Sequence, residues 1–202
     1  LLSSIGLTAD DIDVVVYDNL ENGHKENVPS RAKLVLGDLS DISKLESCFK
    51  ENKIDAVIHF AGYIEAGESM KNPMKFFTNN VCNGINLLKV MINNNVQKIV
   101  YSSSAGVYGQ PEQIPIKEDS KKEPVNFYGL SKLMFEQILE SCRVYGIKNI
   151  SLRYFNAAGA SFDIGENHNP ETHLIPLVLK SALSGSELKV FGDNYETPDG
   201  SC

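Results

Sequence analysis

Tyr128 and Lys132 lie four residues apart in the stretch FYGLSK at positions 127–132. On a helix, this spacing places both side chains on one face. An ammonium beside a tyrosine hydroxyl favours the tyrosinate, so we expect Lys132 to lower the pKa of Tyr128 and make it a proton acceptor near neutral pH. Structural helices also carry this spacing, so the meaning of the pair depends on its surroundings.

The pair follows a regular alternation of short apolar runs and longer helical patterns. Strands are expected at 14–17, 33–36, 56–60, 98–101 and 149–153, with a weaker sixth at 188–191. Helical patterns span about 43–50, 74–94, 128–145 and 174–183. This alternation predicts an α/β fold with a doubly wound parallel sheet, in which ligands lie at the carboxyl ends of the strands.

Polar residues directly follow the first two expected strands. Asp18 begins the run DNLENG at 18–23, and a carboxylate there can bond both hydroxyls of an adenosine ribose, although a turn aspartate has the same appearance. Asp38, followed by Leu39, offers an acceptor for an adenine amine or, alternatively, a helix cap. Both positions therefore favour a nucleotide-binding edge.

The next three strands end in small, hydroxyl-bearing or aromatic residues. FAG at 60–62 lets a flat ligand approach the backbone closely, and SSSAGVYG at 102–109 presents hydroxyls suited to a reacting oxygen. YFN at 154–156 places two aromatic rings and an amide at the same edge. A serine/glycine loop and simple burial are the alternatives for the last two runs.

Composition excludes several classes of protein. The chain has 202 residues, a net charge of −7 and a pI of about 5.1, which argues against a nucleic-acid surface. No apolar run approaches the length of a membrane span, so no membrane contact is expected. The four cysteines and four histidines lack metal-ligand spacing, so we expect free thiols and no metal.

Together these residues resemble the extended short-chain dehydrogenase/reductases, and within them the UDP-glucose 4-epimerases of the NAD-dependent epimerase/dehydratase family. The resemblance runs from about Val14 to the last residue. Its most specific strings are RYFN at 153–156, LIP at 174–176 and FGDNYETPDG at 191–200. It implies a Rossmann-like fold and, in galactose metabolism, interconversion of UDP-glucose and UDP-galactose by transient hydride transfer to bound NAD.

The resemblance also implies a role for each residue. Tyr128 is the expected catalytic base, Lys132 its partner and a ligand of the nicotinamide ribose, and Ser104 a hydrogen-bond partner of the sugar oxygen. The expected cofactor-binding residues are Asp18, Asn19, Leu20, Glu21, Asn22, Asp38, Leu39, Phe60, Ala61, Gly62, Asn79, Ser102, Tyr128, Lys132 and Tyr154. The expected substrate-binding residues are Ser104, Tyr128, Tyr154, Phe155, Asn156, His173, Leu174, Val190 and Phe191.

Four positions depart from the family pattern. Ile64 replaces a usual Lys, Gly106 a usual Thr or Ser, Phe127 a frequent Pro, and His173 a usual Asn. The first two changes remove polar groups from the site, so we expect a lower rate. Dehydratases usually carry acidic residues near 105–106, and their absence here counts against dehydration, though an epimerase for another nucleotide sugar remains an alternative.

The family opens with a strand and a glycine loop that holds the pyrophosphate, and no such pattern precedes Val14. We therefore expect residues 1–156 to form an NAD-binding domain without its first strand, and 157–202 to begin a UDP-sugar-binding domain. The chain is expected to be a fragment of a cytoplasmic, homodimeric enzyme or, alternatively, a truncated non-catalytic chain. Alone, it should neither bind NAD firmly nor turn over UDP-galactose.

Overall fold

The computed structural model describes residues 12–160, 165–166, 168, 171–189 and 192–200. The chain divides into two compact units, Leu1–Asn156 and Ala157–Cys202. The first unit contains the strands β1 (Val15–Asp18), β2 (Lys33–Leu36), β3 (Val57–His59), β4 (Lys98–Ser104) and β5 (Lys148–Tyr154). Its helices are α1 (Ile42–Glu51), α2 (Ala66–Ser69), α3 (Pro73–Phe76), α4 (Asn83–Asn93) and α5 (Phe127–Ser141).

All five strands pair in parallel, but they fall into two sheets. β1 pairs with β2, placing Val16 opposite Leu34, and β3, β4 and β5 pair in that order. Within the described residues, β1 and β3 therefore each have only one paired edge. This interruption between β1 and β3 agrees with the absence of a strand pattern before Val14. The mixed α/β fold with parallel strands is the one predicted.

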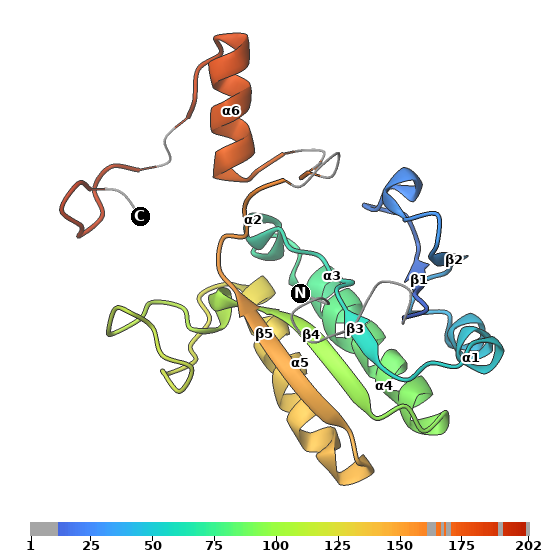
Figure 1. Cartoon of the computed structure of the whole chain (residues 1–202). Helices are drawn as coiled ribbons and strands as arrows, with labels where there is room; N and C mark the ends of the chain where they lie inside the picture. The colour runs from blue at the N-terminus through green and yellow to red at the C-terminus, as the bar shows by residue number, and fades with distance from the viewer. Residues whose placement is uncertain (1–11, 161–164, 167, 169–170, 190–191, 201–202) are drawn as a thin grey trace. The chain divides into compact units, whose positions relative to one another are not determined.

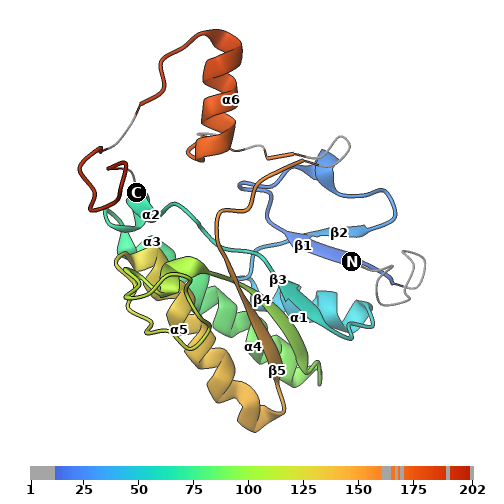
Figure 2. The same cartoon turned by 60° about the vertical axis from the view of Figure 1, so that its left-hand side comes forward.

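Helices α4 and α5 lie on the same face of the β3–β4–β5 sheet (Figures 1 and 2). Between helices and sheet lies the main core, whose side chains are fully or almost fully buried. Its buried members are Leu45, Phe49, Leu87, Leu88, Val90, Met91, Val96, Ile99, Tyr101, Phe135, Leu139 and Ile147. Leu45 and Phe49 come from α1, so the same core joins the β1–β2 side of the unit to the larger sheet.

The expected helix at 74–94 is interrupted. The structure has α3, then a π-helix at Phe77–Cys82, then α4. Within the π-helix, the buried Asn80 amide donates to the carbonyl of Tyr63 at 3.0 Å and to Ser131 Oγ at 3.0 Å. Asn80 Oδ1 accepts from the Tyr63 backbone N–H at 2.9 Å. These long-range hydrogen bonds offset the cost of the irregular turn, a kind of turn that is frequent at functional sites.

Capping residues position the helix that carries Tyr128 and Lys132. Asn126 is the N-cap of α5, and its side chain accepts from the Gly129 backbone N–H at 2.7 Å. A 3₁₀ turn at Cys142–Tyr145 follows α5, and Gly146 ends it with a left-handed φ of 81°. The expected span of 128–145 therefore covers an α-helix and a 3₁₀ turn.

The second unit contains α6 (Leu174–Ser184), which agrees with the expected helix at 174–183 and ends at Gly185 with φ 67°. The expected strand at 188–191 is not formed at Leu188 and Lys189, and Val190 and Phe191 lie outside the described residues. None of the helices in the described part of the chain is long and apolar enough to cross a membrane.

The packing of α4 against α5 leads to a stability prediction. A Cβ on Gly84 would lie 2.5 Å from Phe135 Cε2, in a fully buried contact. Gly84→Ala should therefore lower the free energy of unfolding by about 1–3 kcal/mol through overpacking. Gly67, in helix α2, has nothing within 4 Å of its Cβ position, so Gly67→Ala should be neutral or slightly stabilising. Urea denaturation measures both, and equal stability of the two variants would contradict this packing.

Candidate active site

The carboxyl ends of β1, β2 and β3 surround a cavity of about 270 Å³. Its lining residues are Tyr17, Asp18, Asn19, Glu21, Asn22, Gly23, Gly37, Asp38, Leu39, Phe60, Ala61, Gly62, Tyr63 and Asn79. The cavity therefore gathers most of the expected cofactor residues at one sheet edge. Leu20, Ser102, Tyr128, Lys132 and Tyr154 are not in its lining.

A tight turn holds the carboxylate at the end of β1. Asp18 Oδ1 accepts from the Leu20 backbone N–H at 2.7 Å, and Leu20 has an unusual positive φ of 57°. A Cβ on Gly23 would lie 3.0 Å from Asp18 Oδ1, so the turn folds closely over the carboxylate. Asp18 is thus a turn residue that also lines the cavity, and its bond to a ribose stays a prediction.

Asp38 at the end of β2 is held by two donors. Asn19 Nδ2 donates to its Oδ2 at 2.7 Å, and the Ser40 backbone N–H donates to its Oδ1 at 2.8 Å. Hydrogen bonds from Ser40, first from its side chain, lower the pKa of Asp38 and keep it ionised. The N-cap of α1 is Asp41, which accepts from the Lys44 backbone N–H, so the helix-cap alternative for Asp38 is wrong.

Tyr63 bridges the two sheets across the cavity, a role that the sequence analysis missed. Its hydroxyl donates to the carboxylate of Glu21 at 2.8 Å, and its backbone is held by Asn80. The Lys75 ammonium lies 4.2 Å from the centroid of its ring. Tyr63 and Glu21 are 42 residues apart, so no local pattern indicates their contact.

Lys132 is almost completely buried, with 3% of its surface exposed. Its Nζ donates to the carbonyl of Ser102 at 2.9 Å, which joins α5 to β4. A Cβ on Gly62 would lie 3.4 Å from this Nζ, so the ammonium stands directly behind the cavity wall. Burial lowers the pKa of Lys132 to about 8.

Ser104, at the end of β4, and Tyr128, in α5, form the hydroxyl pair. Burial raises the pKa of Tyr128, and hydrogen bonding by the neighbouring Ser104 side chain lowers it by less, so the net direction is upward. The Lys132 ammonium lies 5.8 Å from the centroid of the Tyr128 ring and is not among the causes of the shift. The expectation that Lys132 lowers the pKa of Tyr128 is therefore wrong for this structure, because desolvation outweighs the other effects.

The end of β5 brings one more expected residue next to the hydroxyl pair. Tyr154 pairs with Ser104 across the β4–β5 ladder and is 41% exposed. Phe155 and Asn156, the last residues of the first unit, are exposed. Their expected contacts with the substrate stay a prediction.

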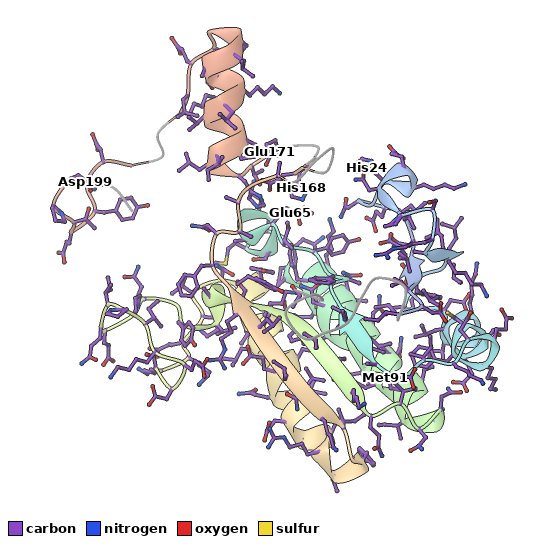
Figure 3. All side chains as sticks on the ribbon, in the orientation of Figure 1. His24, Glu65, Met91, His168, Glu171 and Asp199 are labelled. Carbon is purple, nitrogen blue, oxygen red and sulfur yellow. The ribbon has the colours of Figure 1, made fainter. Side chains whose placement is uncertain are left out.

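In the second unit, two imidazoles and two carboxylates gather on the segment before α6. Ligand atoms of Glu166, His168, Glu171 and His173 all lie within 4.8 Å of one another, and Figure 3 shows His168 and Glu171 close together. Zinc accepts this donor set, and the sequence spacing did not indicate it. Contacts of the Glu166 carboxylate with Nδ1 of both histidines also account for the cluster. His173 directly precedes Leu174, and both are exposed; Val190 and Phe191 lie outside the described residues.

Lys132 carries a pH-dependent stability prediction. Its pKa is about 8 when folded and 10.5 in a model compound, so between these values only the unfolded chain holds the proton. The free energy of unfolding therefore rises with pH across that window. Below about pH 8 the folded chain also holds the proton, so the full cost of burying the charge is present there. Relative to Lys132→Met, the wild-type chain should gain roughly 3 kcal/mol between about pH 7 and pH 11. Urea denaturation across this range measures the difference, and a difference independent of pH would contradict the buried ammonium.

Comparison with known proteins places this geometry in a family. Residues 6–199 match the model of the NAD dependent epimerase/dehydratase family. A UDP-glucose 4-epimerase of Streptococcus mutans is 51% identical over 193 residues, which cover 93% of this chain and 58% of that protein. A UDP-glucose 4-epimerase of Lactobacillus helveticus is 48% identical with the same coverage. The chain thus spans somewhat more than half the length of these curated relatives.

Solved structures agree in fold. The UDP-glucose 4-epimerase of Brucella ovis in complex with NAD superimposes with a TM-score of 0.90 at 40% identity, covering 99% of this chain and 61% of that one. The enzyme of Bifidobacterium longum in complex with NAD+ and UDP gives a TM-score of 0.86 at 40% identity, with coverage of 93% and 60%. The first unit is accordingly of the Rossmann type, and the chain belongs to the NAD-dependent epimerase/dehydratase family.

Proposed function

We propose that the whole protein carrying this chain interconverts UDP-glucose and UDP-galactose by inverting C4 of the sugar, with NAD as its bound cofactor. The hydroxyl pair carries the proposal, because it brings Tyr128 of α5, a candidate proton acceptor, near the hydroxyl of Ser104 at the end of β4. The relatives named above, at 48% and 51% identity, support the choice of reaction.

The lining of the cavity suits a dinucleotide. Its 270 Å³ lie at the carboxyl ends of parallel strands, where such folds bind nucleotides. The carboxyl groups of Asp18 and Asp38 present acceptors for ribose hydroxyls and an adenine amine, and Gly62 contributes a wall of backbone without a side chain. Bound NAD would supply reversible hydride acceptance, which no side chain in this site offers.

The chain's own residues handle the proton. Tyr128 accepts the proton of the sugar's 4-hydroxyl and returns it after the keto sugar has presented its other face. Ser104 donates to the Tyr128 oxygen, which stabilises the tyrosinate against the effect of burial. Lys132 has ammonium protons beyond the one donated to the Ser102 carbonyl, and these are available for a ribose hydroxyl.

The two units divide the binding work in this proposal. The first unit holds NAD, with Ser102 and Tyr154 near the nicotinamide, and the second begins the UDP-sugar site with His173 and Leu174. We also propose a homodimer, on the basis of the family resemblance. A cytoplasmic location accords with Cys48, Cys82 and Cys142, which are free thiols.

Substitutions at the site bear on the rate and on substrate choice. Ile64, where the family usually has Lys, is 39% exposed, and a Cβ on Gly106 would lie 3.3 Å from Ser104 Oγ. Neither residue offers a polar group to the sugar or cofactor, so we propose a slower enzyme than typical relatives. An epimerase for another nucleotide sugar is the second candidate, since a UDP-Glc/GlcNAc 4-epimerase of Campylobacter jejuni is 38% identical with a TM-score of 0.77.

Replacement of the proposed base tests the function. In the full-length protein, Tyr128→Phe should lower kcat for UDP-galactose by about 10²–10⁴-fold while NAD stays bound, because only the proton acceptor is lost. Tyr145→Phe is the matched control, since this tyrosine lies after α5 and is 60% exposed. A coupled assay of UDP-glucose formation measures the rates, and an unchanged rate in Tyr128→Phe would sink the proposed role.

A further inference from the structure

A partly buried ion pair joins β5 to α5 away from the cavity. Arg153 Nε donates to Glu136 Oε1 at 3.0 Å, and its Nη2 donates to Oε2 at 2.7 Å. The two side chains are 19% and 9% exposed, so water screens this forked contact weakly. Nothing in the proposed proton transfer uses either residue.

The same pair holds two further segments. Glu136 Oε1 accepts from Ser103 Oγ at 2.5 Å, which adds β4 to the contact. Arg153 Nη1 donates to the hydroxyl of Tyr108 at 2.7 Å and to the carbonyl of Glu118 at 2.9 Å. The guanidinium also lies 5.0 Å from the centroid of the Tyr108 ring. We call Arg153, Glu136 and Tyr108 the clamp, because they draw β4, β5, α5 and the turn after β4 together.

The clamp surrounds the residues that carry the hydroxyl pair. Ser103 immediately precedes Ser104, and Tyr108 ends the 3₁₀ turn that begins just after Ser104. That turn presses on the start of α5: a Cβ on Gly129 would lie 2.6 Å from the carbonyl oxygen of Gly106. Gly129 follows Tyr128, so displacement of the turn changes the position of one hydroxyl relative to the other.

Along α5, Glu136 lies one turn beyond Lys132 and two turns beyond Tyr128, on the same side of the helix. Its contact with Arg153 therefore resists rotation and sliding of the helix against the sheet. The clamp contacts β4 and the 3₁₀ turn on either side of Ser104, through Ser103 and Tyr108. Through Glu136 it also holds α5, the helix that carries Tyr128.

We propose that the clamp acts as a set of positioning residues that fixes the distance between the hydroxyls of Ser104 and Tyr128, and thereby sets the rate of proton transfer. This role rests on the proposed epimerase function and deepens it. Misplacement of a catalytic group by about 1 Å is enough to cost 10²-fold in rate. Substrate and cofactor binding, which depend on other residues, should change little.

The test compares two substitutions on one helix of the full-length enzyme. Glu136→Gln removes the negative charge of the clamp. Glu140→Gln removes a negative charge from an exposed ion pair, in which the side chains of Arg143 and Glu140 are 62% and 57% exposed. We expect Glu136→Gln to lower kcat at least tenfold, with KM for UDP-glucose and NAD content within twofold of wild type. Glu140→Gln should leave all three unchanged.

A pH profile separates positioning from a merely structural role. The Ser104 hydrogen bond lowers the pKa of Tyr128, so a weakened bond should move the acid limb of the kcat profile to higher pH. The other groups that act on Tyr128 or face it, Glu65, Lys132 and Tyr101, are unchanged in the variant. Tyr108→Phe keeps the ring and removes the hydrogen bond from Arg153 and the long one to the Glu118 carbonyl. It should give a smaller change in the same direction, and it serves as the test if Glu136→Gln fails to fold.

A kcat within twofold of wild type in both clamp variants would overturn the proposal. The proposal would also be overturned if a clamp variant yielded less folded protein but kept the wild-type kcat per bound NAD. An equal loss of kcat in Glu140→Gln would overturn it too. A wild-type protein that binds NAD but does not epimerise UDP-glucose overturns the proposed function and the clamp's role with it, whereas an active wild type with unaffected variants overturns the clamp alone.

Discussion

The buried hydrogen bond from Lys132 to the carbonyl of Ser102 is the contact on which the site depends. It brings an ammonium into a position where only 3% of its surface is exposed, and burial lowers its pKa to about 8. The helix that carries Lys132 must then lie against β4, which places Tyr128 one turn earlier beside Ser104. The same ammonium stands behind Gly62, so the hydroxyl pair and the cavity wall share one point of attachment.

Two layers of contacts keep that arrangement fixed. The core of α1, α4 and α5 side chains holds both sheets, although their strands do not pair with one another in the described residues. Across the cavity, Tyr63 joins Glu21 to the loop after β3, with Asn80 as its support. The strand ends therefore face a common space even where the sheet is interrupted. Asp18 and Asp38 line this cavity, and hydrogen bonds from backbone N–H groups in the adjoining turns orient their side chains.

The location of residues at the strand ends could be predicted from the sequence, because apolar runs mark the strands and the residues that follow a run lie at its carboxyl end. The parallel α/β fold and the gathering of Asp18, Asp38 and Gly62 at one edge both follow from alternating apolar runs. Long-range contacts left no local signal, so Tyr63 with Glu21 and Arg153 with Glu136 were missed. The π-helix depends on hydrogen bonds from the Asn80 side chain to segments distant in the sequence, and helix propensities of the local residues do not predict it. The predicted direction of the Tyr128 pKa shift was wrong, because the cost of burying the tyrosinate outweighs the effects that favour it. Residue spacing does not indicate how deeply a side chain is buried.

In the proposed reaction, a hydride leaves C4 of the sugar for NAD and the proton of the 4-hydroxyl moves to Tyr128; the hydride then returns to C4 and the proton to the oxygen that C4 carries. The most direct measurement supplies the full-length protein with UDP-glucose deuterated at C4 and locates the label in the product by NMR. This account predicts UDP-galactose that keeps its deuterium at C4, because the transferred hydride does not exchange with water. Product that has lost the label to solvent, or intact NAD-loaded protein that forms no UDP-galactose, would contradict it.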